Sequence, residues 1–312
     1  MTVSKSGRTN EFYFFGGKDE SSQDLIQGIT LAGAFFDEVA LMPQSFVNQA
    51  TARCSVTGSK FWFNCNPGSP QHWFYLEWVR KCRSRKMMYL HFTMDDNLSL
   101  SEDIKARYRS QYSGVFYQRY ILGLWTVAEG LVYDMFDRKK HVVDELPELS
   151  PKSAYVACDF GTQNATVFLL FQKQADADCW IVTREYYYSG REQKRQKTVG
   201  EYVTDLKAWL NGLKPERIIV DPSALPLITE LRKNGFTQTP ANNDVLSGIL
   251  DVQTMLQTGR LKIYKDCKHT LEEFGVYAWD PDKDDTVLKV NDHCMDAIRY
   301  FVRTKRLVKL RD

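Results

Sequence analysis

The sequence lacks paired cysteines, a strong net charge and long apolar runs. Its seven cysteines occur singly, with no C-x-x-C pair, which argues against a zinc ribbon or a dithiol redox motif. A formal charge of +2 excludes a histone-like polycation but not a local basic patch. We find no signal peptide and no apolar run of transmembrane length, so we expect no membrane partner and a reducing cytoplasm as the place of action.

The sequence also lacks a complete phosphate-binding loop. Gly17-Lys18 matches the end of the pattern G-x-x-x-x-G-K-[ST], but Phe12 stands where the pattern needs Gly and Asp19 where it needs Ser or Thr. The backbone amides and the lysine of that loop hold nucleotide phosphates. We therefore expect a turn here, and a poor ATPase activity for this polypeptide by itself.

The chain is long enough, and has enough apolar residues, to form two domains. It has 312 residues, of which 43% are hydrophobic, so it can fill a core. Short apolar runs and helical patterns predict an α/β fold, with strands that include residues 11–15 and 87–92. We expect residues 1–10 to be loose because they are polar. Residues 126–150 mix Gly, Pro and charges in the manner of a linker.

Three aspartates in the second half follow a pattern. Asp159 ends the apolar strand that begins at Tyr155, and Asp221 ends the strand that begins at Arg217. Asp296 lies three residues after His293 in a C-terminal helix, so these two share one helix face. Carboxylates are costly to desolvate, and an oxygen-rich site suits Mg²⁺ or Mn²⁺. The order is that of the ribonuclease-H-like nucleases, although each aspartate alone could equally cap a turn.

A second acidic motif lies in the first half. The apolar run Ile29–Phe36 ends in Asp37-Glu38, the shape of a nucleotide-hydrolase motif in which the first acid holds Mg²⁺ and the second polarises water. The alternative is a solvated acidic turn. The next strand ends at Asn64 and Asn66, which fit either a γ-phosphate sensor or an ordinary Asn-Pro-Gly turn.

Several segments together closely resemble the PBSX-type large terminase subunits of tailed phages. They are Gly16–Glu20, Phe36–Pro43, Ala52–Cys54, Asn64–Gly68 with His72–Phe74, and the later Asp159, Asp221, His293 and Asp296. The likeness covers nearly the whole chain, and both halves match in order. It implies a P-loop-type ATPase domain, here partial and without Walker A, followed by a ribonuclease-H-like nuclease domain of the RuvC/integrase type with a mixed central sheet.

The resemblance also implies boundaries and roles. It divides the chain into the C-terminal portion of the ATPase domain (1–125), a linker (126–150) and the nuclease domain (151–312). Carried over, Asp37 holds Mg²⁺, Glu38 is the catalytic carboxylate, Asn64 and Asn66 belong to the coupling segment, and Arg53 faces the nucleotide. The family's phosphate-binding loop lies upstream of residues 11–15. We therefore expect a fragment of the large subunit, with ATP and Mg²⁺ used only by the full-length member.

For the second half, the resemblance implies a Mg²⁺- or Mn²⁺-dependent endonuclease that cuts concatemeric DNA during packaging. Asp159 is expected to bridge two divalent ions, and Asp221 and Asp296 each to bind one. His293 is either an acid or base or a packing residue, and Asp292 is a spare carboxylate. The implied partners are double-stranded DNA, the small terminase subunit and the portal protein in the cytoplasm of a bacterial host, with oligomerisation on the portal for the full-length protein only.

Three other functions fit parts of the sequence. The chain could be a catalytically inactive DNA-binding or interaction module of the packaging motor. It could be a competent ATPase with an unrecognised phosphate loop. A Holliday-junction resolvase would share the acidic site, but it would leave residues 1–125 unexplained.

Overall fold

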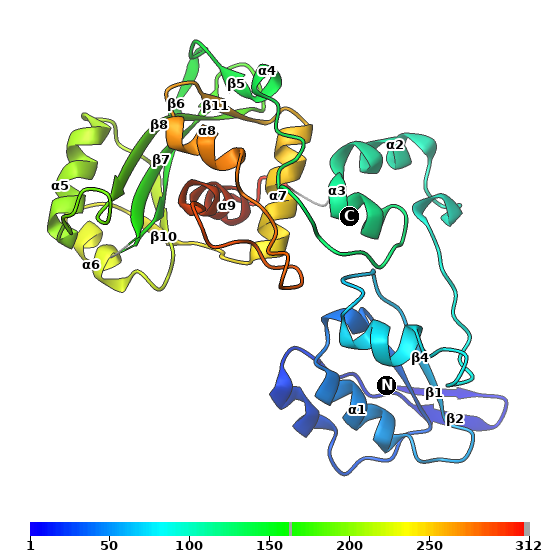
Figure 1. Cartoon of the computed structure of the whole chain (residues 1–312). Coiled ribbons are helices and arrows are strands. Elements are labelled where there is room, and N and C mark those ends of the chain that lie inside the picture. Colours follow the sequence, from blue (N-terminus) through cyan, green and yellow to red (C-terminus); the bar gives the residue numbers. More distant parts are fainter. Residues whose placement is uncertain (162–163, 309–312) are drawn as a thin grey trace. The chain divides into compact units, whose positions relative to one another are not determined.

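Figure 1 shows the computed structural model, which describes residues 1–161 and 164–308. The described chain forms two units. Unit 1 comprises Met1–Asp96 and Gln118–Val127, and unit 2 comprises Asn97–Tyr117 and the described residues from Ala128 onward. Both units combine strands with helices, so the α/β fold predicted from the sequence is confirmed.

Unit 1 is built around a parallel pair of short strands. Its elements are β1 (Thr2–Lys5), β2 (Arg8–Glu11), η1 (Glu20–Ile26), β3 (Gly33–Phe36), η2 (Val39–Leu41), α1 (Gln44–Arg53), β4 (Lys60–Phe63), η3 (Tyr75–Val79) and η4 (Met94–Asp96), where η denotes a 3₁₀ or π helix. β3 and β4 pair in parallel, with Phe36 opposite Phe63. The two rings stack and pack near Trp78 in a small apolar core.

Three local predictions for unit 1 are wrong. Residues 12–15 and 87–92 form no strand, and the polar start of the chain forms the antiparallel hairpin β1–β2. The apolar side chains that predicted those two strands are largely exposed, among them Phe14 and Met88. An apolar run becomes a strand only where a neighbouring strand pairs with it, and the sequence does not show which strands are neighbours.

Unit 2 contains most of the helices and the larger sheet. Its elements are α2 (Glu102–Gln111), α3 (Gly114–Tyr120, whose end belongs to unit 1), α4 (Arg138–His141), β5 (Val142–Val143), β6 (Leu149–Asp159), β7 (Ala165–Gln174), β8 (Trp180–Ser189), α5 (Val199–Leu210), β9 (Arg217–Val220), α6 (Leu225–Lys233), β10 (Gln238–Pro240), α7 (Val245–Gln257), β11 (Leu261–Tyr264), α8 (Lys268–Phe274) and α9 (His293–Lys305).

The described strands of unit 2 form one mixed sheet in the order β10-β9-β6-β7-β8-β11-β5. The central strands β6, β7 and β8 form an antiparallel meander, while β9 and β11 add in parallel on either side. The mixed central sheet predicted for this half is confirmed. Because β6 and β9 run in the same direction, their carboxyl ends lie at the same edge of the sheet.

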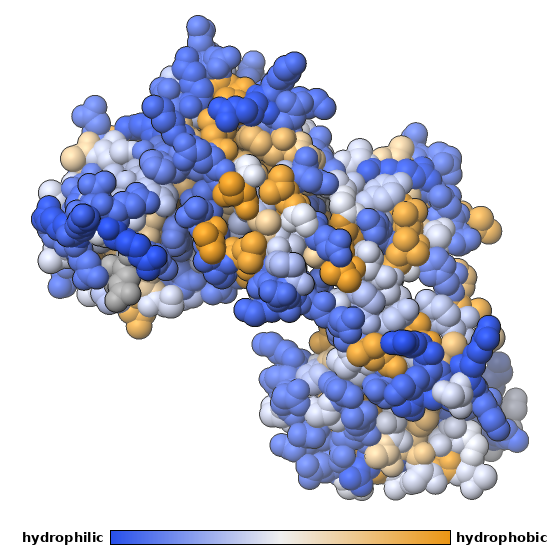
Figure 2. Space-filling model, in the orientation of Figure 1, coloured by the Kyte–Doolittle hydropathy of each residue, from blue (hydrophilic) through white to orange (hydrophobic). Residues whose placement is uncertain are grey.

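Helices cover both faces of this sheet (Figure 1). Along β6 the side chains alternate: Val156 and Cys158 pack with α5 and α6, and Tyr155 and Ala157 pack with α7, α8 and α9. Continuing the alternation places Asp159 on the face that α9 covers. Apolar patches interrupt the hydrophilic surface in Figure 2, and the protein exposes large apolar side chains in both units.

Most of residues 126–150, predicted as a linker, belong to unit 2, which takes up the chain again at Ala128. Val132 and His141 are buried, β5 pairs with β11, and Nε2 of Gln253 donates to the carbonyl oxygen of Val132 over 2.7 Å. The domain boundaries after residues 125 and 150 stay a prediction from the sequence.

Candidate active site

The carboxyl ends of β6 and β9 bring two aspartates to one edge of the sheet. Cys158 pairs in register with Val220, so Asp159 and Asp221 are the next residues along two adjacent parallel strands. Hydrogen-bonded strands lie about 4.8 Å apart, which keeps the two backbones close. The strand pairing therefore brings together two carboxylates that are far apart in the sequence.

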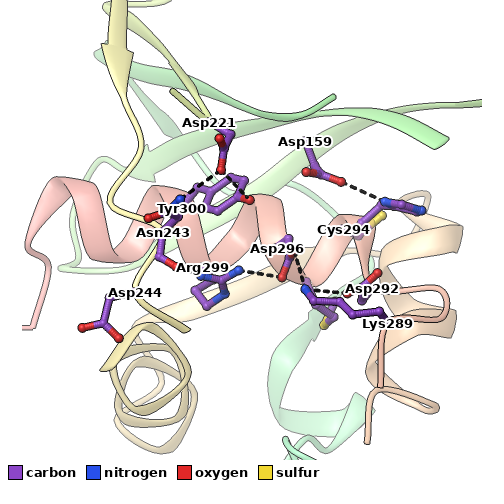
Figure 3. Close-up of polar contacts among 12 residues, drawn as sticks. Asp159, Asp221, Asn243, Asp244, Lys289, Asp292, Cys294, Asp296, Arg299 and Tyr300 are labelled. Carbon is purple, nitrogen blue, oxygen red and sulfur yellow. Dashed lines mark hydrogen bonds and ion pairs between the residues drawn. The ribbon is translucent and has the colours of Figure 1, made fainter. Parts of the chain in front are cut away.

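Helix α9 adds the third aspartate. α9 packs against β6, β7 and β9, and its first turn carries Asp296. Figure 3 shows Asp159, Asp221 and Asp296 around Tyr300 of the same helix. Burial raises the pKa of Tyr300, and the negative charges of all three aspartates raise it further. The three predicted nuclease carboxylates therefore face a common region rather than separate surfaces.

Asp159 is paired with His293, the first residue of α9. Nδ1 of His293 lies 2.8 Å from Oδ2 of Asp159, and both side chains are largely buried. Burial raises the pKa of Asp159, an effect that the hydrogen bond from His293 opposes. Burial alone lowers the pKa of His293, but the hydrogen bond and charge of Asp159, together with the charges of Asp292 and Glu273, outweigh it, so the pKa is raised. The structure thus places His293 directly on a predicted metal-binding carboxylate.

Asp221 accepts hydrogen bonds on both oxygens. The backbone N–H of Ser223 donates to Oδ1 over 2.8 Å, while the hydroxyl of Tyr300 and Nδ2 of Asn243 donate to Oδ2 over 3.2 and 3.3 Å. Burial raises the pKa of Asp221, but these donors stabilise the charged form and hold the pKa below its usual value. Asp221 is therefore an ionised, oriented carboxylate at neutral pH.

Two positively charged side chains pair with Asp296. Arg299 donates to Oδ1 over 2.8 Å, and Nζ of Lys289 donates to Oδ2 over 3.1 Å (Figure 3). The same Nζ lies 2.9 Å from Oδ2 of Asp292, the spare carboxylate of the sequence analysis. Burial alone lowers the pKa of Lys289, but the two aspartates outweigh it and raise the pKa. Lys289 is therefore a charged bridge between Asp292 and Asp296.

Two further residues hold α9 in place. Oε2 of Glu273 accepts hydrogen bonds from the backbone N–H groups of Cys294 and Met295 over 2.7 and 3.1 Å, and so caps the start of the helix. Burial raises the pKa of Glu273 to about 8. Arg299, almost fully buried, also donates to the carbonyl oxygen of Asn243 over 2.9 Å. These contacts fix the helix face that carries His293 and Asp296.

Sequence reasoning missed several residues of this site. Arg299 could have been found, because it lies three residues after Asp296 and so on the same helix face. Lys289, Asn243 and Glu273 gave no signal, since their contacts depend on segments that only the fold brings together.

The donor set suits a hard divalent cation, since carboxylate oxygens are the ligands that Mg²⁺ and Mn²⁺ prefer. Its arrangement is less favourable. Within residues 1–161 and 164–308, no group of three or more His, Cys, Asp or Glu side chains is placed so that it could hold a metal ion. Arg299 and Lys289 also occupy both oxygens of Asp296.

The predicted motor residues of unit 1 also gather at strand ends. Asp37 and Glu38 follow β3, and Asn64 follows its parallel partner β4. Nδ2 of Asn64 donates to Oδ1 of Asp37 over 2.9 Å. Oδ1 of Asn64 accepts from the backbone N–H of Glu38 over 2.8 Å. Glu38 has a left-handed backbone with φ of 55°. One asparagine thus links both acids of the motif.

Arg53 and Asn66, the two other predicted nucleotide residues, are not linked to Asp37 or Glu38 by any hydrogen bond among the described residues. Asn66 is exposed, two residues beyond Asn64. Arg53 ends α1, and its Nε is buried without a hydrogen-bond partner among the described residues. The predicted roles of Asp37, Glu38, Arg53, Asn64 and Asn66 stay predictions.

Family profiles match both halves of the chain. The profile "Terminase large subunit, T4likevirus-type, N-terminal" matches residues 2–140, and "Terminase RNaseH-like domain" matches residues 163–305.

Solved structures and curated sequences give the same likeness. The large terminase of a thermophilic bacteriophage is 52% identical, with a TM-score of 0.90, over 97% of this chain and 76% of that one. A crystal form of the same terminase in complex with ADP is 51% identical, with a TM-score of 0.87 and the same coverage of both chains. The terminase large subunit of Escherichia phage T5 is 25% identical over 228 residues, which is 68% of this chain and 50% of that protein.

The chain spans about half the length of the curated relatives it matches, with shares of 50%, 57% and 46%. None of the helices formed by the described residues combines the length and apolar character that crossing a membrane requires.

Proposed function

Because the chain belongs to the phage terminase large-subunit family, we propose that unit 2 is a metal-dependent endonuclease that cuts concatemeric DNA during genome packaging. The observation that carries this proposal is the convergence of Asp159, Asp221 and Asp296 from β6, β9 and α9. Three acidic side chains at one sheet edge are costly unless a cation or a proton compensates them.

We assign the metal-binding role to Asp159, Asp221 and Asp296, as the sequence suggests. When bound, a pair of Mg²⁺ or Mn²⁺ ions supplies activation of water and stabilisation of the leaving oxygen in phosphodiester hydrolysis. The chain's own groups orient that site: Tyr300 and Asn243 fix Asp221, and Arg299 fixes Asp296. His293, bonded to Asp159, is positioned to hold or release a proton beside it.

The proposed substrate is double-stranded DNA, cut with little sequence preference. Further partners of the proposal are the small terminase subunit and the portal protein, in the cytoplasm of a bacterial host. Assembly on the portal belongs to the full-length protein. These assignments rest on the family to which the chain belongs.

For unit 1 we propose a part of the nucleotide-driven motor. Support comes from the Asp37–Asn64–Glu38 links and from the thermophilic phage relative solved in complex with ADP. The G-x-x-x-x-G-K-[ST] pattern is absent from this sequence. ATP hydrolysis with Mg²⁺ is therefore assigned to the full-length family member and not to this chain alone.

A plasmid-nicking assay with Mn²⁺ tests the nuclease. The wild-type chain is expected to convert supercoiled plasmid to nicked and linear forms, and Asp159→Ala to lose this activity. Equal nicking by both proteins would refute the assignment. If neither cuts but both retain DNA binding, the chain is the inactive DNA-binding module, a reading that the ion pairs on Asp296 favour.

A further inference from the structure

Lys289 pairs with an oxygen of Asp296 that would have to be free for Asp296 to bind a metal ion. Its Nζ lies 3.1 Å from Oδ2 of Asp296 and 2.9 Å from Oδ2 of Asp292 (Figure 3). Arg299 takes the other oxygen of Asp296. The single carboxylate that α9 adds to the site is thus neutralised on both sides by the chain's own cations.

The two cations differ in how firmly they are held. The Arg299 side chain is 2% exposed and wedged against Gly248 of α7, so it cannot leave without disturbing the core. The Lys289 side chain is 58% exposed and reaches Asp296 from outside. The two carboxylates that it pairs with are largely buried, at 11% exposed for Asp296 and 7% for Asp292, so only the lysine side of the pair faces solvent. Lys289 is therefore the displaceable cation of the pair.

The segment that carries Lys289 is anchored just before this residue. Val287 is buried and bridges Trp279, and the backbone N–H of Leu288 donates to the carbonyl oxygen of Ala278 over 3.0 Å. The flanking Val290 is 65% exposed, and Asn291 has a left-handed backbone with φ of 50°. The half-exposed Lys289 side chain can therefore turn away from Asp296 by rotation about its own bonds, while its backbone and α9 stay in place.

We propose that Lys289 competes with a divalent ion for Asp296 and so sets the cation concentration at which this carboxylate becomes a metal ligand. The inference rests on the proposed function, because it concerns the same carboxylates. It assigns to Lys289 a regulatory role through Asp296 rather than a role on the reacting atoms.

A Mn²⁺ titration of the full chain, followed by calorimetry, tests the competition without measuring cleavage. Lys289→Ala is expected to bind Mn²⁺ about fivefold more tightly than wild type, the size expected for losing one half-exposed ion pair. Lys289→Arg keeps the charge and is expected to bind like wild type. Lys283→Ala is the matched control, because Lys283 lies in the same segment, is exposed and pairs with Asp280 rather than with the site.

The outcomes separate this inference from the proposed function. Unchanged or weaker Mn²⁺ binding by Lys289→Ala, or equally tighter binding by Lys283→Ala, overturns the competition while leaving a metal site. If wild type binds Mn²⁺ and Asp159→Asn binds it equally well, the metal assignment itself fails. Thermal unfolding without metal checks that the variants are folded, and a larger Mn²⁺-induced shift for Lys289→Ala gives a second readout.

Discussion

A Cβ atom added to Gly248 would lie 2.4 Å from Cγ and 2.8 Å from Cδ of Arg299. Helix α7 can therefore pass the buried stem of Arg299 only because residue 248 has no side chain. The guanidinium at the end of that stem holds Asp296. The position of the third carboxylate thus depends on a glycine in a different helix.

Replacing Gly248 by Ala is expected to destabilise unit 2 and to displace Arg299. Overpacking a core costs about 1–3 kcal/mol, against which the better helix propensity of Ala returns about 1 kcal/mol. Urea unfolding should show a lower midpoint with an unchanged slope. Mn²⁺ binding should also change, since Asp296 loses its fixed partner.

Gly200→Ala is the control for that substitution. Gly200 also lies in a helix, α5, but a Cβ there would meet no atom within 4 Å. Its replacement should leave stability unchanged or raise it by up to about 1 kcal/mol. Equal destabilisation by both substitutions would show that the Gly248–Arg299 contact is not the cause.

Asp159→Asn is expected to lower the pKa of His293. In the wild type this carboxylate raises the pKa of His293 and, together with Asp292 and Glu273, outweighs the effect of burial. Without its charge, burial acts with less opposition and favours the neutral ring. An NMR titration of the histidine ring protons measures this. His141, which is buried against the carbonyl of Leu256, should titrate as before. A His293 titration that does not move would refute the pairing.

Glu273→Gln is expected to flatten the pH dependence of stability. Because burial raises the folded-state pKa of Glu273 to about 8 from an ordinary 4.5, the folded state retains a proton that the unfolded state loses. Stability contributed by the protonated side chain is therefore complete at low pH and lost as pH rises through this window. Gln can still accept from the N–H groups that begin α9.

Unfolding measured at several pH values between about pH 5 and pH 8 tests this window. The wild type should lose more stability than the glutamine variant as pH rises. A stability difference between the two proteins that is constant across the range, or a glutamine variant that loses more stability than the wild type as pH rises, would contradict the burial argument.

The chain alone is expected to bind ATP more weakly than the micromolar range. It lacks the phosphate-loop pattern whose amides and lysine hold the β- and γ-phosphates. Equilibrium titration with a fluorescent ATP analogue and Mg²⁺ measures this. Micromolar affinity that Asp37→Ala abolishes would reveal a phosphate loop that the sequence pattern does not show.

The strand-end aspartates show how far the sequence could go. Apolar runs that stop at Asp159 and Asp221 predicted both strands and their ends, because burial of alternate side chains leaves a direct pattern in the sequence. The strand predictions for residues 11–15 and 87–92 were wrong. A strand forms only beside a partner strand, and the local sequence does not show which segment that partner is.

The sequence by itself determined the family, the α/β class, and which acids end the strands of the sheet, because these follow from residue order and periodicity. Only the tertiary structure decided what each acid contacts. No sequence pattern connects Lys289 or Gly248 with Asp296. In the structure Lys289 forms an ion pair with Asp296, and Gly248 leaves room for Arg299, which holds Asp296. Such contacts arise when separate elements pack together, and a one-dimensional pattern carries no record of which surfaces will meet.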